Sequence, residues 1–595
     1  MTDADLREIS IEVRDGMRIS WDVPIVMTDG TVIRADVFLP DRDGSWPVVM
    51  SHGCYAKGLS FQEAYTAQWD RMTTDFPEIT EGTSNKYQVW EVVDPERWVP
   101  DGYAVVRVDS RGAGRSQGVH NVWSMQEIWD YYECIEWAGE QPWSTGDVGL
   151  LGISYYGANQ WLVASLQPPH LKAIIPWEGT SDWYREVFYH GGIRNGFLDQ
   201  WLPKQLPMQH GYGGRGRRNP NTGELVAGPE TLTDEELESN RVDKVSEVRE
   251  HPLADEYYRG LAPEWQNLTL PILSAANWGG QGLHLRGNVE GFVQAASTQK
   301  WLEVHGLEHW THFYTPYGVD LQKRFFDHFL RGIDNGWDTQ PRVTLQVRHI
   351  DPGDKGSIAG RFVQRAEDAW PLERTEWTRH YLHATDSTLR TEPAGAEASV
   401  EYDATGSGAT FASPIFDEDV EITGPLAAKL FVSSATTDAD LFLVLRVFDP
   451  LGAEVVFRGA MDAHTPVAQG WLRASHRRLD PRLSEPYRPY HPHTTAEPVE
   501  PGEIYEVDVE IWPTSVVVPA GYRIALTVRG KDYEYEGPAD EDENSAHRYP
   551  SRGVGPFVHA DPVDRPNDVF GGAVRIHTGG SHESYLLLPV IPAKQ

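Results

Sequence analysis

The chain has 595 residues, of which 40% are hydrophobic and 24% charged, and its formal net charge is −36 at pH 7. This length exceeds what one hydrophobic core supports, so we expect two or three domains. The negative charge argues against nucleic acid and anionic membranes as partners, because both are polyanions. Cys54 and Cys134 are the only cysteines, which excludes a disulfide framework and a cysteine-rich metal site. No secretory leader or membrane span is recognisable, which predicts a cytoplasmic protein.

The first third of the chain alternates between extended and helical patterns. Residues 19–27 and 32–39 are predicted to form a hairpin around Asp29 and Gly30. Ser124 and Glu127 have the spacing of a capping box and predict a helix start. Buried strands are expected at residues 47–50, 103–108, 148–151, 172–176, 270–276 and 300–305. Alternation of this kind predicts a doubly wound, mostly parallel sheet with helices on both faces.

Two segments depart from this alternation. Residues 184–265 contain no buried strand, and an insertion of this size between sheet strands predicts a helical cap over the site. Beyond Pro341, short strands at regular spacing predict an all-β sandwich of the jelly-roll type. We therefore expect a catalytic α/β domain of residues 1–183 and 266–340, the cap at 184–265, and the β-sandwich at 341–595.

Ser154 lies in Gly152-Ile-Ser-Tyr-Tyr-Gly157, between a predicted strand and a predicted helix. This resembles the nucleophile elbow G-x-S-x-G, although the second glycine comes one residue late. A buried structural serine between small residues is the alternative interpretation. The glycine-rich stretch Asp109–Gly118 loosely resembles a dinucleotide-binding turn, but its third glycine is displaced and no acidic residue follows at the expected distance, so no cofactor is predicted.

A serine nucleophile needs a base, a group that orients the base, and donors for the oxyanion. In hydrolases of this topology the histidine follows the last strand, and here that position offers His309 and His312. A metal site of His305, His309 and His312 is the rival interpretation. We predict no metal, because these histidines lie on a strand end and a loop, without cysteine or helical spacing.

Several motifs together resemble the CocE/NonD hydrolases, which are related to cocaine esterase, the α-amino acid ester hydrolases and the X-Pro dipeptidyl-peptidases. The motifs are the serine turn, the Asp109–Gly118 stretch, Trp137-Ala-Gly-Glu-Gln-Pro-Trp143 and Trp310-Thr-His312. The resemblance covers nearly the whole chain and implies an α/β-hydrolase fold with a cap and a C-terminal jelly roll. It implies that Ser154 is the nucleophile and His312 the base. It also implies an oxyanion hole made by the Tyr155 amide and the Tyr55 hydroxyl.

The sequence departs from this family at the triad acid. Members usually carry an aspartate after the next-to-last strand, whereas residues 277–284 read Asn-Trp-Gly-Gly-Gln-Gly-Leu-His and contain no carboxylate. Glu178, at the end of the preceding strand, is the candidate acid, with Glu308 and Asp182 behind it.

The predicted function is a serine hydrolase that cleaves an ester or amide bond through an acyl-enzyme intermediate. Its substrate would be a small molecule or a short peptide, and relatives suggest a homo-oligomer, a dimer or larger. An X-Pro-type dipeptidyl-peptidase or aminopeptidase is the alternative within this class. A metal-dependent hydrolase and a catalytically idle scaffold with a jelly-roll binding module are the alternatives of other classes.

Overall fold

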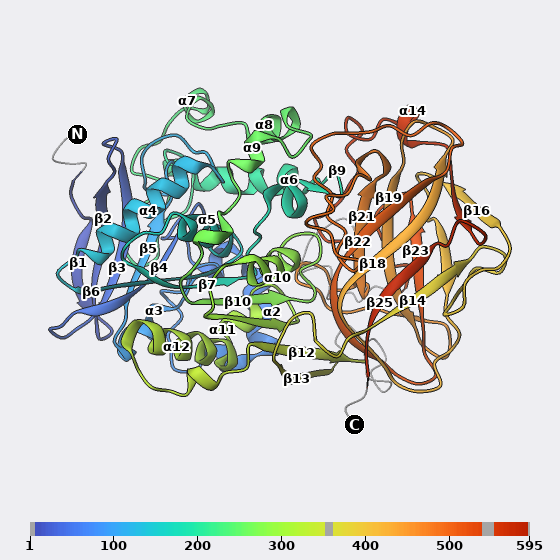
Figure 1. Cartoon of the computed structure of the whole chain (residues 1–595). Coiled ribbons are helices and arrows are strands. Elements are labelled where there is room, and N and C mark those ends of the chain that lie inside the picture. Colours follow the sequence, from blue (N-terminus) through green and yellow to red (C-terminus); the bar gives the residue numbers. More distant parts are fainter. Residues whose placement is uncertain (1–5, 351–360, 538–551, 593–595) are drawn as a thin grey trace.

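The computed structural model describes residues 6–350, 361–537 and 552–592. Figure 1 shows two lobes, an α/β lobe formed by the first part of the chain and a β-rich lobe formed by the last part. No helix in the described ranges has the length and apolar character that crossing a membrane requires.

One sheet forms the centre of the α/β lobe. From one edge to the other its strands are β1 (Ser10–Arg14), β2 (Met17–Val26), β3 (Val32–Pro40), β5 (Ala104–Asp109), β4 (Trp46–Gly53), β6 (Ser144–Ile153), β7 (Leu171–Trp177), β10 (Ile272–Asn277), β11 (Lys300–His305), β12 (Val343–His349) and β13 (Arg361–Glu367). The strands from β5 to β12 in this order run parallel, and the remaining neighbours pair antiparallel. The predicted doubly wound sheet is confirmed, and parallel strands of this kind end together at one edge, where side chains from distant segments meet.

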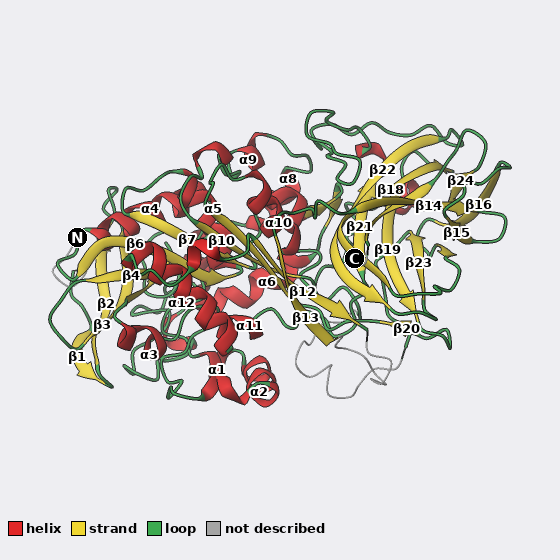
Figure 2. Cartoon of the chain, turned by 60° about the horizontal axis from the view of Figure 1, so that its bottom comes forward, coloured by secondary structure: helices red, strands yellow, loops and turns green. Residues whose placement is uncertain are grey.

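Helices cover both faces of the sheet (Figures 1 and 2). Helix α12 (Pro316–Arg331) lies on one face, and α4 (Met125–Gly139), α5 (Tyr155–Ser165) and α10 (Leu285–Gln294) lie on the other. Helix α4 begins as predicted, since the Ser124 hydroxyl accepts the Glu127 amide at 3.2 Å. The Glu127 carboxylate, however, accepts the amide of Trp123 and not that of Ser124, so the second half of the capping box is displaced by one residue.

The segments outside the sheet carry short helices. Between β4 and β5 the chain forms α1 (Phe61–Ala64), α2 (Thr66–Asp75) and α3 (Pro95–Trp98). Between β7 and β10 it forms a π-helical turn (Trp183–Phe188), the hairpin β8 (Tyr189–His190) and β9 (Ile193–Arg194), and the helices α6 (Phe197–Gln205), α7 (Asp234–Ser239), α8 (Lys244–Glu250) and α9 (Glu256–Arg259). This second group lies along the upper side of the α/β lobe in Figure 1, with α6 next to the β-rich lobe.

The C-terminal lobe is built from mostly antiparallel strands. Its central pairs are β18 (Val420–Ser434) with β22 (Tyr505–Val518), β19 (Asp440–Phe448) with β23 (Arg523–Arg529), and β14 (Glu376–His383) with β25 (Tyr585–Ile591). The other elements are β15 (Thr388–Arg390), β16 (Ala398–Asp403), β17 (Ala409–Ala412), β20 (Glu454–Val455), β21 (Ala468–Arg473), α14 (Asn567–Phe570) and β24 (Ala573–Thr578). The predicted β-rich C-terminal domain is confirmed.

The two lobes share backbone hydrogen bonding. Strand β12 pairs with β11 as far as Leu345 and then, from Arg348, pairs in parallel with β22 of the C-terminal lobe. The buried Arg348 side chain donates to the carbonyl of Ser515 at 3.0 Å. The sheet of the α/β lobe is thus continuous with the C-terminal lobe.

Candidate active site

Ser154 stands at the sharp turn between β6 and α5. Its backbone has φ 58° and ψ −114°, a strained conformation for a residue with a side chain. A Cβ on Gly152 would lie 2.4 Å from the Cβ of Tyr156, and one on Gly157 would lie 2.7 Å from the carbonyl oxygen of Trp177. Both glycines are needed for this close approach, and the second is displaced by one residue because Gly157 is the position that faces β7. The turn has the backbone geometry of a nucleophile elbow.

The Ser154 side chain contacts a histidine from the loop after β10. His284 Nε2 lies 3.1 Å from Ser154 Oγ, and His284 Nδ1 accepts a 3.1 Å hydrogen bond from the Thr180 amide. A neutral imidazole carries one hydrogen, and since Nδ1 is the acceptor here, that hydrogen is on Nε2. Burial, and next the neighbouring His309, hold the pKa of His284 well below its usual range. His284 therefore stays neutral and donates to Ser154 Oγ.

Beside His284 lies a buried chain of alternating carboxylates and imidazoles. Glu178 Oε2 is 2.7 Å from His309 Nδ1, and Glu178 Oε1 is 3.0 Å from His305 Nε2. The chain extends from His309 Nε2 to Glu91 Oε1 at 3.1 Å, and from His305 Nδ1 to Glu303 Oε2 at 2.7 Å. All five side chains belong to residues that are at most 4% exposed. The ring of His309 is nearly parallel to that of His284, with ring centres 5.2 Å apart.

Burial and ion pairing set the charges in this chain. Burial alone would raise the pKa of Glu178, but His309 and His305 outweigh it and lower that pKa to about 2. Burial also opposes protonation of His309, yet Glu178 and Glu91 raise its pKa to about 10. At Glu91 burial dominates over the hydrogen bond from His309 and raises the pKa to about 7. Glu91 is therefore the member of the chain that exchanges a proton near neutral pH.

The structure does not bring His312 to Ser154. The His312 ring packs 5.2 Å from the ring of His305, and neither of its nitrogens has a hydrogen-bond partner in the part of the chain that the structure describes. Among the described residues, His312 therefore makes no hydrogen bond to Ser154, and its role as the base stays a prediction. His312 belongs to the helical turn α11 (Thr311–Tyr314), whereas His309 precedes that turn. His284 is the imidazole that contacts Ser154, and the His309 ring lies nearly parallel to that of His284.

Glu178 does contact a histidine of the loop after β11, and the two reserve candidates for the acid do not. Glu308 accepts from the Thr311 hydroxyl at 3.2 Å and forms an ion pair of 3.3 Å with Arg458. Asp182 forms an ion pair of 2.7 Å with Arg185. Their carboxylates serve local structure.

Two residues of the site were not foreseen from the sequence. His284 lies in the loop after the next-to-last strand, where family members usually carry the triad aspartate. The signal in the sequence is therefore this position, and the residue type gives none. Glu91 comes from the loop between β4 and β5, in a stretch without hydrophobic period, and no sequence signal marks it.

The expected oxyanion donors, Tyr55 and Tyr155, line the same pocket as Ser154. Tyr155 is the first residue of α5, and the amide of a first helical residue has no acceptor within its helix. The Tyr55 hydroxyl accepts from Trp201 Nε1 at 3.2 Å, which leaves its own hydrogen free to donate. Burial raises the pKa of Tyr55 well above its usual range, so the phenol keeps that hydrogen. The rings of Tyr55 and Tyr155 pack edge to face, with centres 5.8 Å apart.

A small pocket opens beside Ser154, His284 and Tyr55. Apolar and aromatic side chains form most of its wall, and these are Trp123, Trp183, Val187, Phe197, Trp201 and Leu283. None of the described residues that line it is an aspartate or a glutamate. The cavity suits an apolar group attached to the bond under attack.

The loop that carries Tyr55 is fixed by a buried lysine. Lys57 Nζ lies 3.0 Å from Asp22, 3.4 Å from Asp36 and 3.4 Å from Asp109. Asp109 also accepts the backbone amide of Lys57 at 2.6 Å. In the Asp109–Gly118 stretch, Gly114 packs closely on the Asp109 carboxylate, since a Cβ on Gly114 would lie 2.2 Å from Asp109 Oδ2.

Comparisons with known proteins agree with this geometry. The model of the S15 family of X-Pro dipeptidyl-peptidases matches residues 29–314, and the model of the X-Pro dipeptidyl-peptidase C-terminal non-catalytic domain matches residues 335–587. A solved CocE/NonD family hydrolase from Staphylococcus aureus is 34% identical, with a TM-score of 0.81 over 97% of this chain and 94% of that chain. Cocaine esterase from Rhodococcus sp. is 26% identical over 96% of this chain and 98% of that protein. An aminopeptidase from a Thaumarchaeota archaeon, 16% identical with a TM-score of 0.64 over 99% of each chain, shares the fold.

The serine turn, the neighbouring imidazoles and the full-length match to a solved relative lead to one assignment. The chain belongs to the CocE/NonD family of hydrolases and is a serine hydrolase of the esterase and peptidase group.

Proposed function

We propose that this serine hydrolase cleaves carboxylic esters, with Ser154 as the nucleophile. His309 acts as the base and Glu178 as the acid that orients it. The observation that carries this assignment is the 2.7 Å contact between Glu178 and His309 Nδ1. A carboxylate on Nδ1 fixes the imidazole and stabilises its protonated form, which is the role of the acid in a catalytic triad. The Tyr155 amide and the Tyr55 hydroxyl form the oxyanion hole.

The proton of Ser154 has to reach His309. Because His284 donates to Oγ, the Ser154 hydroxyl hydrogen points elsewhere. The carbonyl of Glu91 accepts the Ile153 amide at 3.0 Å, which supports a location of the Glu91–His309 pair directly beside the elbow. Catalytic hydrogen bonds are often long in ligand-free enzymes and shorten when the substrate binds.

The first step follows from these roles. His309 passes its Nε2 proton to the Glu91 carboxylate and takes the hydroxyl proton of Ser154, while Oγ forms a bond to the carbonyl carbon. The carbonyl electron pair moves to the oxygen, which Tyr55 and the Tyr155 amide stabilise. When the oxyanion collapses, the bond to the alcohol oxygen breaks and that oxygen takes the proton from His309. Water then attacks the acyl-enzyme and gives its proton to Nε2 of the neutral His309, and Ser154 Oγ takes that proton as it leaves with the acid released. Glu91 finally returns its proton to His309 Nε2, which restores the starting state.

The cavity favours an ester over an N-terminal dipeptide. A dipeptidyl-peptidase must bind the free amino group of its substrate, and an ammonium group in a buried site needs a carboxylate or other acceptors. The described lining is aromatic and apolar around Ser154 and carries no carboxylate. The S15 family match favours the second candidate, an X-Pro dipeptidyl-peptidase.

Labelling and substrate comparison test this proposal. We expect the wild-type chain to react with a fluorophosphonate and to hydrolyse p-nitrophenyl esters of aromatic acids faster than Gly-Pro p-nitroanilide. Ser154→Ala should lose both the label and the turnover. Retained labelling in that variant would refute the nucleophile, and faster cleavage of the anilide would assign the peptidase activity. A folded wild-type chain that neither labels nor hydrolyses would favour the idle scaffold.

We further propose that residues 341–595 form a C-terminal domain whose strands from β14 onward make a jelly roll while β12 and β13 extend the catalytic sheet, and that residues 184–265 cap the catalytic domain of residues 1–183 and 266–340. Antiparallel pairing of β18 with β22 and of β19 with β23 supports the jelly roll, and Phe197 and Trp201 in the cavity wall support the cap. The free, buried Cys54 and Cys134 support a reducing compartment such as the cytoplasm. Resemblance to relatives supports a homo-oligomer, a dimer or larger.

A further inference from the structure

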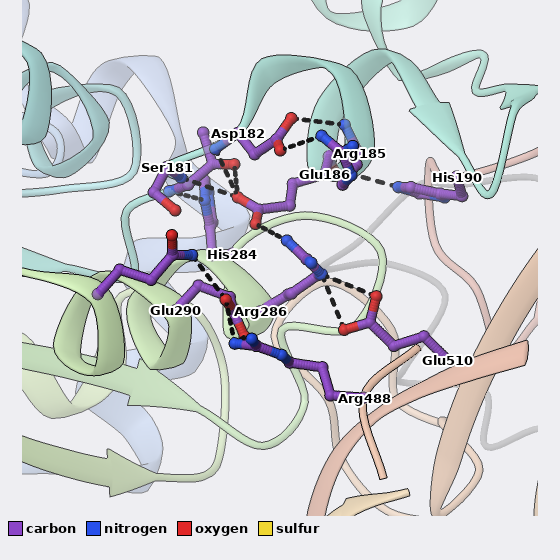
Figure 3. Close-up of polar contacts among 12 residues, drawn as sticks. Ser181, Asp182, Arg185, Glu186, His190, His284, Arg286, Glu290, Arg488 and Glu510 are labelled. Atoms are coloured by element: carbon purple, nitrogen blue, oxygen red, sulfur yellow. Dashed lines mark hydrogen bonds and ion pairs between the residues drawn. The ribbon is translucent and has the colours of Figure 1, made fainter. Parts of the chain in front are cut away.

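The loop that holds His284 is folded around one buried carboxylate. Glu186 Oε2 accepts from the Thr180 hydroxyl at 2.5 Å, from the Ser181 amide at 2.8 Å and from the Asp182 amide at 3.0 Å. Glu186 is fully buried. Figure 3 shows this carboxylate surrounded by the loop on one side and by the Arg286 side chain on the other. Glu186 thus fixes the segment whose Thr180 amide donates to His284 Nδ1.

A second set of contacts ties the same carboxylate to the C-terminal lobe. Arg286 Nη1 donates to Glu186 Oε1 at 3.0 Å, and Arg286 Nε donates to both oxygens of Glu510 at 3.0 and 3.1 Å. Glu510 belongs to β22, whereas Arg286 lies in the first turn of α10, two residues after His284. A second ion pair, 2.8 Å between Glu290 of α10 and Arg488, holds the same helix farther along (Figure 3).

The packing of α10 onto this loop is close. A Cβ on Gly287 would lie 2.5 Å from Glu186 Oε2 and 2.5 Å from the Ser181 amide nitrogen. The absence of a side chain at this helical position lets the backbone of α10 touch the loop. The His284 ring is therefore held from its own helix and from the Thr180 loop at once.

We propose that His284 is a fixed hydrogen-bond donor to Ser154 and not a proton acceptor, and that Glu510 of the C-terminal lobe helps to position it through Arg286 and Glu186. The proposal rests on the proposed role of Ser154 as nucleophile. Its basis is the hydrogen bond that the Thr180 amide donates to His284 Nδ1. If His284 accepted a further proton, it would carry N–H on both ring nitrogens. Its Nδ1 hydrogen would then face the Thr180 N–H, so two donors would meet without an acceptor.

A fixed donor acts on Ser154 Oγ twice in the reaction. Negative charge develops on Oγ when the hydroxyl loses its proton, and again when the acyl-enzyme expels Oγ during hydrolysis. A pre-oriented N–H next to that oxygen stabilises both transition states without reorganisation. His284 is in this sense a catalytic residue that remains neutral through the cycle, while the proton moves through His309.

Glutamine distinguishes a donor from a base at position 284. His284→Gln supplies an amide N–H near the position of Nε2 and an oxygen that can accept from Thr180, but it cannot take a proton. We expect kcat of His284→Gln within about tenfold of the wild type, and kcat of His284→Ala lower by about a hundredfold or more, the usual effect of losing an oxyanion-type donor. Equal loss in the two variants, with both chains folded by circular dichroism, would overturn the donor role. The proposed function fails separately, if Ser154→Ala keeps its activity.

A second pair of variants tests whether Glu510 of the C-terminal lobe helps to position His284. Glu510→Gln weakens the contact to Arg286, and Arg488→Gln breaks the other ion pair of α10, which does not touch Glu186. We expect Glu510→Gln to lower kcat several-fold with KM near the wild-type value, and Arg488→Gln to leave kcat unchanged. Equal kcat values for the two variants would overturn the coupling. The kcat of two further variants tests Glu186: Glu186→Ala should lower kcat, and Glu186→Gln should keep most of the wild-type value.

Discussion

His284 Nε2 lies 3.1 Å from Ser154 Oγ, although 130 positions separate the two residues in the chain. They meet because β6 and β10 both end at the same edge of the parallel sheet, with β7 between them. In the family this loop usually carries an aspartate, whereas here the loop after β10 brings the His284 imidazole to this edge. The carboxylate comes from the end of β7, as Glu178, and it binds the histidine that follows β11.

Matched glutamine variants test whether His309, and not His312, is the base. His309→Gln removes the group proposed to take the Ser154 proton, and general base catalysis contributes about a hundredfold to ten-thousandfold to a rate. We expect kcat to fall within that range. His312→Gln should keep kcat within about threefold, because no hydrogen bond of the described residues involves its ring. A loss in His312→Gln as large as that in His309→Gln would return the base to position 312.

Tyr55 should contribute to the rate through its hydroxyl alone. Tyr55→Phe keeps the ring that packs on Tyr155 and removes one oxyanion donor, which typically lowers kcat by about a hundredfold. The control is Trp201→Phe, which keeps an aromatic wall and removes the indole donor to Tyr55. Steady-state kinetics on one neutral ester should give a kcat loss with a small change of KM in Tyr55→Phe, and a much smaller loss in the control. An unaffected kcat in Tyr55→Phe would exclude the phenol from the oxyanion hole.

Activity should decline on the acidic side of neutrality. Burial raises the pKa of Glu91 to about 7. Below that pH the carboxyl is already protonated and cannot receive the proton of His309, whereas above it the carboxylate is free. We expect kcat/KM for a neutral ester to fall as the pH drops through about 7. Glu91→Gln should remove this limb along with most of the activity, and a residual activity with an unchanged acidic limb would assign the titration to another group.

Lys57 is expected to be a large contributor to stability. Lys57→Met leaves Asp22, Asp36 and Asp109 buried without their shared cation, and removal of one partner from a buried ion pair costs about 3 to 5 kcal/mol. Urea unfolding should show this loss as a lower midpoint. The control Lys429→Met removes a partly exposed ion pair with Asp508, for which we expect a change of at most about 1 kcal/mol. Similar midpoints for the two variants would contradict the structural role of Lys57.

Some elements of the fold and the site could be predicted from the sequence, and others could not. The runs that became β6, β7, β10 and β11 were recognisable because parallel strands covered on both faces are continuously apolar, and the glycines around Ser154 marked its turn. The loop from Gly306 to His312 has no period, so nothing in the sequence decides which histidine faces Glu178. The structure decides it: Leu307 has φ 68° in the turn before His309, and the helical turn α11 begins before His312.

The sequence did not predict that Glu91 and His284 belong to the site, for a related reason. Their side chains reach the site through tertiary contacts made by loops, and loops carry no pattern that records such contacts. Glu178 was found because it directly follows a strand, where the direction of the chain is fixed by the sheet.

The position of strand β12 limits how the protein can be divided for expression. It pairs with β11 as far as Leu345 and with β22 from Arg348, so backbone hydrogen bonds of one strand connect the two lobes. A chain truncated at residue 341 would lack β12, and the outer edge of β11 would have no neighbouring strand. Such an unpaired edge can pair with strands of other chains. The catalytic half expressed alone should therefore aggregate.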